Sequence, residues 1–237
     1  MKTAIVVFPG SNCDRDVQRA VEETLKSPVE MVWHENKEFE SEPDLVILPG
    51  GFSYGDYLRS GAMAARSPII DAVRRHAEAG KLLLGICNGF QVLTEAHLLP
   101  GALLTNTSTT FICKECWIRV ENTETYFTSG LKKGSLVQYP IAHKEGLFFL
   151  RPDELKKLEE EGRVVFRYAD PETGEAGAKY APNGALNGIA GICNKEGNIL
   201  GLMPHPERST AAHLIGGSDG ADFWRSIAKG FAERGKC

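Results

Sequence analysis

Cys87 lies in a sequence pattern that suits a nucleophile. Residues 85–91 read Gly-Ile-Cys-Asn-Gly-Phe-Gln and join an apolar stretch at 82–86 to a helical pattern. Glycines on both sides of a cysteine allow a sharp strand-to-helix turn, which presents the side chain at the carboxyl edge of a sheet. A thiol beside a helix N-terminus also gains thiolate character. The alternative is a small core residue in a tight turn, and this motif alone leaves both interpretations open.

His205 and Glu207 supply the acid–base groups that a cysteine nucleophile needs. They belong to the run Met-Pro-His-Pro-Glu-Arg at 203–208, directly after an apolar stretch at 199–202. Pro206 disfavours helix at His205 and keeps the backbone extended, so we expect the two side chains to project to the same side. The carboxylate can then hold one imidazole nitrogen while the other faces the thiol. The alternative is an exposed turn with a solvated histidine.

Gly50 and Gly51 predict an oxyanion site. They follow an apolar run at 45–48 and belong to the run Pro-Gly-Gly-Phe-Ser-Tyr-Gly-Asp-Tyr-Leu-Arg at 49–59. Acyl transfer needs backbone N–H groups aimed at the developing oxyanion, and paired glycines let the backbone come close to a substrate. We expect the N–H groups of Gly51 and Asn88 to be the donors. The alternative is an ordinary glycine turn, and the spacing does not fit a Walker phosphate loop.

Alternating strand and helix patterns position these motifs on one sheet edge. Strands alternating with helices over the first hundred residues imply right-handed crossovers and a mostly parallel sheet with helices on both faces. A β-rich excursion at about 103–150 is carried on the same domain. The predicted strands are 3–8, 29–33, 45–48, 82–86, 164–166, 189–192 and 199–202, and helices are expected after residue 12, after Pro68, after Cys87, at 152–161 and at 221–232.

Composition limits the classes of protein that fit. The chain has 237 residues and is 42% hydrophobic, which predicts one α/β domain with a substantial core. The formal net charge is −4, and Lys and Arg are scattered along the sequence, so it predicts no basic patch that would bind nucleic acid. The N-terminus lacks a cleavage-site pattern and no apolar run approaches the length needed to span a bilayer. We therefore expect a cytoplasmic protein that binds neither nucleic acid nor a membrane.

Six cysteines in a chain of this length do not indicate a disulfide framework, so we expect reduced thiols. Cys113 and Cys116 form a CxxC, but no second pair stands at zinc-ribbon spacing and the surrounding residues resemble a strand. Buried structural thiols are the expected reading of this pair, with a metal or redox role as the minor alternative.

Together these motifs make the chain similar to the class I (triad) glutamine amidotransferases. Within that group it resembles the glutaminase subunits of phosphoribosylformylglycinamidine synthase, which act in de novo purine biosynthesis. The similarity spans nearly the whole chain, 1–237, as a single domain. The runs that carry it are Pro-Gly-Ser-Asn-Cys-Asp at 9–14, 49–59, 85–91, Ile-Ala-His-Lys-Glu-Gly at 141–146, and 203–208.

The resemblance implies a flavodoxin-like three-layer sandwich and a catalytic triad. It carries the nucleophile onto Cys87, the acid–base onto His205 and its partner onto Glu207. It also implies that Gln91 contacts the bound glutamine, with Gly50, Gly51 and Phe111 completing the substrate site. No metal or cofactor is implied for this chain. The implied partners are L-glutamine, a large synthetase subunit that uses ATP and Mg²⁺, and a small bridging subunit.

Some positions depart from the family pattern or stay open. Lys144 stands where glycine is usual, and Thr110 where we expect a basic residue, so substrate grip or subunit docking can differ in detail. His143 fits either a solvated loop or a functional role. The expected docking face lies around the mouth of the site, at Tyr54, Tyr57, Arg59 and the 141–146 loop.

Two other functions fit the same residues. One is a stand-alone cysteine hydrolase of γ-glutamyl amides or peptides, which would turn over without a partner. The other is a redox or regulatory module that uses Cys87 as a sensor. A sensor would survive the loss of His205 and Glu207.

Overall fold

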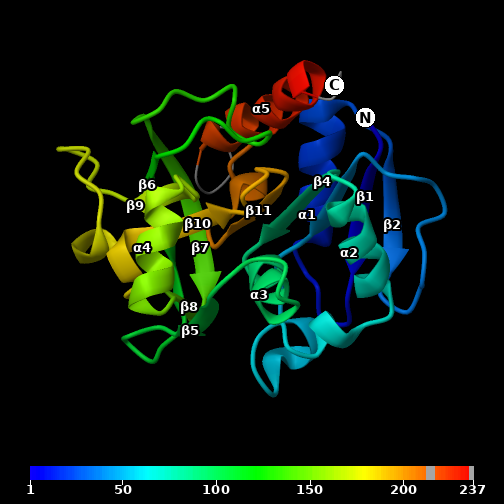
Figure 1. Cartoon of the computed structure of the whole chain (residues 1–237), viewed down its shortest axis with the longest axis horizontal. Coiled ribbons are helices and arrows are strands. Elements are labelled where there is room, and N and C mark those ends of the chain that lie inside the picture. Colours follow the sequence, from blue (N-terminus) through cyan, green and yellow to red (C-terminus); the bar gives the residue numbers. More distant parts are fainter. Residues whose placement is uncertain (212–216, 235–237) are drawn as a thin grey trace.

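A nine-stranded mixed sheet runs through the computed structural model, which describes residues 1–211 and 217–234 (Figure 1). Its strands are β1 (Thr3–Val7), β2 (Val29–Trp33), β3 (Leu45–Leu48), β4 (Leu82–Ile86), β6 (Ile112–Val120), β7 (Leu136–His143), β9 (Val164–Tyr168), β10 (Ile189–Cys193) and β11 (Ile199–Leu202). They lie in the order β2-β1-β3-β4-β11-β10-β9-β6-β7. A separate antiparallel pair joins β5 (Ala102–Thr105) to β8 (Glu145–Phe149).

Helices connect the strands and cover the sheet. The α-helices are α1 (Asp14–Ala20), α2 (Ile69–Glu78), α3 (Asn88–Glu95), α4 (Pro152–Glu160) and α5 (Asp219–Arg234). Val21–Leu25 continues α1 as one π-helical turn, and short 3-10 turns lie at Ser53–Asp56, Ala64–Arg66, Ala178–Tyr180, Leu186–Gly188 and Pro206–Arg208.

The parallel half of the sheet, β2-β1-β3-β4-β11, matches the pattern of the first hundred residues. Every residue of β3 and β4 is buried, as a strand covered on both faces requires. Helix α3 contacts β3, β4 and β11, whereas α1 contacts β1 and the 3-10 turn at Pro206–Arg208 beside α5. The α/β fold with a flavodoxin-like parallel core and helices on both sides is therefore confirmed.

The antiparallel half contains the predicted β-rich excursion. Strands β6 and β7 pair along eight registered positions and extend the main sheet through β9. The interpretation of 141–146 as a loop is wrong, because β7 runs to His143 and β8 begins at Glu145. Only Lys144 separates the two strands, so this segment is held by hydrogen bonds from two sheets.

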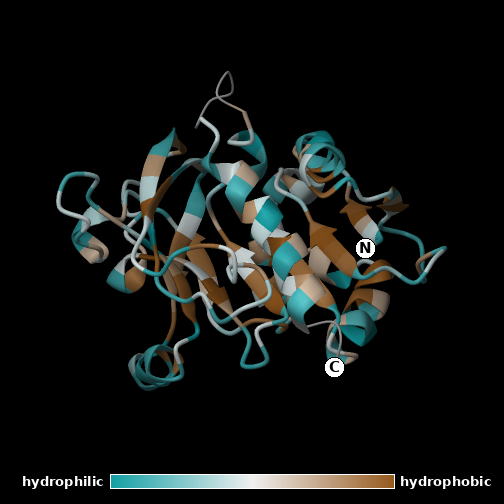
Figure 2. Ribbon diagram, turned by 90° about the horizontal axis from the view of Figure 1, so that it is seen from above, coloured by the Kyte–Doolittle hydropathy of each residue, from teal (hydrophilic) through white to brown (hydrophobic). Residues whose placement is uncertain are grey.

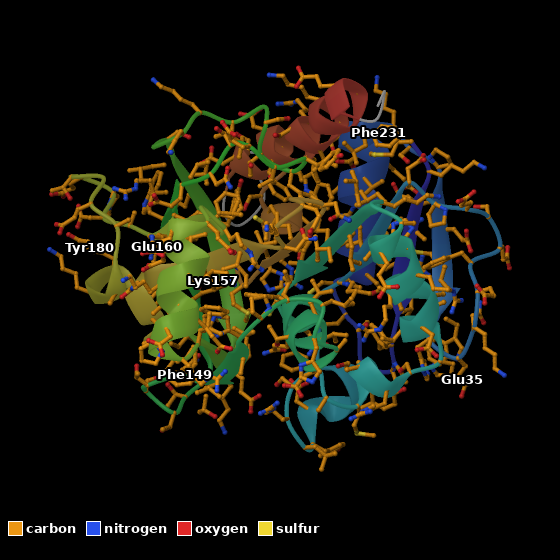
Figure 3. The ribbon with its side chains drawn as sticks, viewed as in Figure 1. Glu35, Phe149, Lys157, Glu160, Tyr180 and Phe231 are labelled. Carbon is orange, nitrogen blue, oxygen red and sulfur yellow. The ribbon has the colours of Figure 1, made fainter. Side chains whose placement is uncertain are left out.

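Hydrophobic residues gather along the strands, while the helices alternate hydrophobic and hydrophilic faces (Figure 2). Figure 3 shows the Lys157 and Glu160 side chains on α4, in the antiparallel half. Both are exposed, whereas Leu158 on the same helix is buried. Among the described residues, no helix combines the length and apolarity that a membrane crossing demands.

Candidate active site

Cys87 forms the turn between β4 and α3. Its backbone has φ 49° and ψ −105°, a strained conformation for a residue with a side chain. A Cβ on Gly89 would lie 1.9 Å from the Leu48 carbonyl oxygen, and one on Gly85 would lie 2.5 Å from Leu93 Cδ1. Both glycines are therefore required by close packing, and the predicted nucleophile elbow is present.

Sheet register brings the histidine motif beside this elbow. Strands β4 and β11 pair in parallel with Ile86 opposite Leu202, so both end at the same edge. The Cys87 N–H donates to the Leu202 carbonyl at 2.8 Å. Three residues after Leu202, the His205 N–H donates to the Pro140 carbonyl of β7 at 2.9 Å. Two strands far apart in sequence thus fix the thiol and the imidazole next to each other.

His205 and Glu207 form the predicted pair by a different backbone route. Imidazole Nδ1 lies 2.6 Å from Glu207 Oε1. The expectation that Pro206 keeps helix away from His205 is confirmed, since His205 has φ −108° and ψ 84°, but the backbone does not stay extended, because Pro206 begins a 3-10 turn that runs to Arg208. Proline suits the first residue of a helical turn, and this turn folds the carboxylate back onto the imidazole.

The second imidazole nitrogen, Nε2, is left for the thiol. It is buried and has no hydrogen-bond partner among the described residues. Burial by itself would lower the pKa of His205, but the charges of Glu207 and Cys87 raise that pKa well above its ordinary value. An imidazole held this way is ready to take and keep a proton from Cys87. The predicted alternative of a solvated histidine is wrong, since His205 is 1% exposed.

A cavity of about 310 Å³ opens onto the thiol. Its lining includes Cys87, Gly51 and Phe111, and Cys87 Sγ lies 3.8 Å from the Ala142 carbonyl oxygen at its wall. Within the part of the chain that the structure describes, the N–H groups of Gly51 and Asn88 donate to no backbone or side-chain acceptor. Both predicted oxyanion donors are therefore free, and Asn88 N–H is the first amide of α3.

The other predicted substrate residues occupy different positions. Phe111 lines the cavity and its ring lies 6.1 Å from that of Phe52. Gln91 also lines it, but its amide accepts from Asn88 Nδ2 at 2.9 Å and donates to the Glu145 carbonyl at 2.5 Å. Gly50 is not part of the lining. A Cβ there would lie 2.7 Å from His205 Cε1, so Gly50 makes room for the imidazole, and its contact with substrate stays a prediction.

His143 is not a solvated loop residue. It is 3% exposed, lines the cavity, and both ring nitrogens lack hydrogen-bond partners among the described residues. Burial and the charge of His205 lower the pKa of His143 to about 3, so its ring is neutral. Lys144 is exposed at the cavity wall, whereas Thr110 lies outside the lining and accepts from Asn106 through its carbonyl.

The residues predicted for a docking face are divided between surface and interior. Tyr57 is 88% exposed beside Leu58, which is 78% exposed. Arg59 reaches back to form an ion pair with Glu95. Tyr54 points inward, because its hydroxyl bonds His34 Nδ1 at 2.9 Å and Ser67 Oγ at 3.0 Å.

Cys13 is a second thiol at the imidazole that the sequence interpretation did not assign. It is buried, and burial raises the pKa of its thiol while the neighbouring His205 opposes the rise. Arg208 Nη2 lies 3.2 Å from Cys13 Sγ, and Arg208 Nε donates to Asp16 at 3.1 Å. The position of Cys13 just after β1, at the same carboxyl edge, was the signal that could have indicated it.

The CxxC does not form a metal or redox pair. Cys113 and Cys116 lie three residues apart on β6, so they point to opposite faces of the sheet. Cys116 is buried as expected, but Cys113 is exposed, so the prediction of two buried thiols is half wrong. Each described cysteine is free, and Cys237 lies outside the described residues.

At the imidazole, Cys13, His205 and Glu207 form a cluster of possible metal-ligand atoms, which lie within 4.8 Å of one another.

A larger cavity, of about 580 Å³, lies in the antiparallel half. Both of its arginines already have partners: Arg163 Nε donates to the Cys193 carbonyl, and Arg167 pairs with Glu159 at 2.6 Å. It holds no histidine, and burial raises the pKa of its one thiol, Cys193, to about 11. The smaller cavity at Cys87 is therefore the candidate active site.

The chain is similar over nearly its whole length to proteins whose family is known. A family model described as the CobB/CobQ-like glutamine amidotransferase domain matches residues 1–216. A relative from Aquifex aeolicus, named phosphoribosylformylglycinamidine synthase subunit PurQ, is 50% identical over 227 residues, which are 96% of this chain and 99% of that protein. A protein of the same name from Gloeobacter violaceus is also 50% identical, over 96% of this chain and 97% of its own. The solved structure of PurLQS from Thermotoga maritima contains a chain that is 44% identical, with a TM-score of 0.83 over 96% of this chain and 97% of that chain.

Proposed function

The chain belongs to the glutamine amidotransferases and, within them, to the PurQ subunits of phosphoribosylformylglycinamidine synthase, and from this premise we propose that Cys87, His205 and Glu207 are its catalytic triad. The observation that carries the proposal is the pairing of His205 Nδ1 with Glu207 at 2.6 Å, which leaves Nε2 unpartnered beside the thiol. A strained elbow and a cavity that opens onto the thiol support it further.

The reaction follows from these positions. His205 Nε2 takes the thiol proton, and Cys87 Sγ attacks the side-chain carboxamide carbon of glutamine. The N–H groups of Gly51 and Asn88 hold the oxyanion, and the imidazolium returns its proton to the leaving nitrogen, so ammonia departs and a thioester remains. His205 then deprotonates a water molecule, which hydrolyses the thioester to glutamate and restores the thiol.

The ammonia is used by a partner. In water at neutral pH it would largely protonate and diffuse away, which favours delivery inside a complex. The partners proposed for this chain are a large formylglycinamidine ribonucleotide synthetase subunit, which uses ATP and Mg²⁺, and a small bridging subunit, in agreement with the PurLQS assembly of the Thermotoga relative. The chain itself is proposed to use no cofactor, since thiol, imidazole and backbone amides supply each step.

Two further assignments belong to this proposal. We treat residues 1–237 as one glutamine amidotransferase domain, supported by the continuous nine-stranded sheet and by the family match over 1–216. We also place the protein in the cytoplasm, supported by the free state of each described cysteine.

Substitution of Cys87 tests the proposal in the assembled complex. Cys87→Ala is expected to abolish glutamine-dependent synthesis and to leave ammonia-dependent synthesis intact, because only the glutaminase step uses the thiol. Cys113→Ala is the matched control, since Cys113 is exposed on β6, and it should keep both activities. Loss of both activities with Cys87→Ala, or of neither, would overturn the proposal.

A second experiment separates the rival functions. A stand-alone cysteine hydrolase would show full glutaminase turnover without the synthetase. A redox sensor would keep its response when His205 or Glu207 is replaced. Glutaminase activity measured with and without the synthetase, for the unsubstituted chain and for His205→Asn, distinguishes these outcomes.

A further inference from the structure

Cys13 and Arg208 border the triad from outside the cavity. Neither is part of the described cavity lining, and Cys13 is buried against the same glycine as the imidazole. A Cβ on Gly50 would lie 3.1 Å from Cys13 Sγ and 2.7 Å from His205 Cε1. Cys13 therefore adjoins the triad at a place that the substrate cavity does not reach.

Arg208 joins the turn that carries Glu207 to helix α1. Its Nη2 donates to Cys13 Sγ at 3.2 Å, and its Nε donates to Asp16 Oδ2 at 3.1 Å. Cys13 is the N-cap of α1, and Asp16 lies in the first turn of that helix. A guanidinium presents its donors in a fixed planar fork, so the two bonds together define its position more narrowly than one bond could. The three-residue turn Pro206–Arg208 is thus fastened to a longer helix.

The Cys13 thiol is itself held in place. Its S–H donates to Asn12 Oδ1 at 3.3 Å while its sulfur accepts from Arg208. Its backbone N–H donates to the Gly50 carbonyl at 3.3 Å. Cys13 is therefore a fixed acceptor for the guanidinium.

The Glu207 carboxylate is buried with one oxygen unpartnered. Oε1 lies 2.6 Å from His205 Nδ1, whereas Oε2 has no hydrogen-bond partner among the described residues. A buried carboxylate in this state is costly unless an opposite charge lies near it. Arg208 supplies such a charge: burial would lower the pKa of the guanidinium, but the charges of Cys13 and Glu207 raise that pKa. The cation that fastens the turn thus also offsets the charge of Glu207.

We propose that Arg208 and Cys13 are positioning residues of the triad: the guanidinium, fixed by the Cys13 thiol, holds Glu207 on the His205 imidazole. Both act through Glu207, and neither touches the substrate. A loosened turn would let the carboxylate and the imidazole shift, and a misplacement of about 1 Å costs about 10² in rate. The inference rests on the proposed glutaminase function.

Arg208→Lys tests the fork. Lysine keeps the positive charge but has a single ammonium in place of the planar fork, so it cannot reproduce the bonds to both Cys13 and Asp16. We expect glutaminase kcat in the assembled complex to fall about 10- to 100-fold while KM stays within about twofold, because the change lies outside the cavity. Ammonia-dependent synthesis should be unchanged, which shows that the complex still assembles. Arg225→Lys makes the same change at an exposed ion pair of α5 and should keep full kcat.

Two substitutions of Cys13 test the acceptor. Cys13→Ala removes it and should lower kcat about tenfold, because a hydrogen bond from a charged donor is lost. Cys13→Ser keeps an acceptor at this position and should recover most of that loss. Equal activity of the two variants would overturn the role of the thiol.

A double-substitution cycle shows whether Arg208 acts through Glu207. In the Glu207→Gln background, Arg208→Lys should lower kcat by less than about twofold, because the carboxylate that it positions is already gone. An additional loss as large as in the unsubstituted background, an unchanged kcat in Arg208→Lys, or a loss confined to KM would overturn the inference while leaving the triad in place. Absence of glutamine hydrolysis by the unsubstituted complex would instead overturn the proposed function.

Discussion

Imidazole Nδ1 of His205 lies 2.6 Å from Oε1 of Glu207, and the two side chains are 2% and 0% exposed. A contact this short between buried groups fixes the tautomer and the orientation of the ring. Burial alone would lower the pKa of His205, but the charges of Glu207 and Cys87 together raise it well above its ordinary value.

Removal of this charge should reduce the acid–base step. Glu207→Gln keeps the shape of the side chain but cannot stabilise an imidazolium, so we expect glutaminase kcat to fall by about 10²–10⁴. Ammonia-dependent synthesis should be unchanged. Glu160→Gln, which makes the same change on the exposed face of α4, is the control and should retain full activity. Wild-type kcat in Glu207→Gln would show that His205 does not need its partner.

The elbow should not tolerate a side chain at Gly89. Because a Cβ there meets the Leu48 carbonyl at 1.9 Å, Gly89→Ala must shift α3 and with it Cys87. We expect a loss of about 1–3 kcal/mol in the free energy of unfolding and a large fall in glutaminase kcat. Gly80→Ala is the comparison, since open space surrounds that position although its φ is +77°. It should lose stability through backbone strain and keep its kcat.

Buried His143 should make the fold sensitive to acid. Its pKa is lowered to about 3 in the folded chain, against about 6.5 when unfolded. The unfolded state therefore binds more protons below pH 6.5, and folding stability contributed by the neutral ring is lost as the pH falls from 6.5 toward 3. His205 has a raised pKa, so its contribution to folding stability depends on pH in the opposite direction. Comparison of the unsubstituted chain with His143→Asn therefore isolates the contribution of His143.

Denaturation with urea at several pH values measures the effect. The destabilisation caused by His143→Asn should shrink on acidification, by about 1.4 kcal/mol for each pH unit below 6.5. If His143→Asn lowers the free energy of unfolding by the same amount at pH 7.5 and at pH 5, the His143 ring is not neutral and buried in the folded protein.

The parallel core and the triad were predictable because each depends on local pattern. Apolar runs that end in glycine-rich turns define strands whose carboxyl ends share an edge, and that is enough to bring Cys87 and His205 together. The spacing of His205 and Glu207 indicated their pairing. It did not reveal the 3-10 turn, because Pro206 fits both an extended segment and the start of a helical turn.

The residues that were missed depend on distant packing. Cys13 joins the site only because β1 lies beside β3 and the imidazole rests against Gly50. His143 looked like a loop residue because its neighbours are polar, yet β7 and β8 bury it. No periodicity within one segment carries such information.

Mass spectrometry after treatment with a glutamine-like chloroketone tests whether Cys87 is the nucleophile. The reagent occupies the glutamine site and alkylates the thiol that attacks the substrate, and peptide mapping identifies which thiol that is. Two thiols lie at the imidazole, Cys87 inside the cavity and Cys13 outside its lining, so the result distinguishes them. We expect one adduct, on Cys87, that glutamine prevents. An adduct on Cys13, Cys113 or Cys193 in place of Cys87 would contradict it.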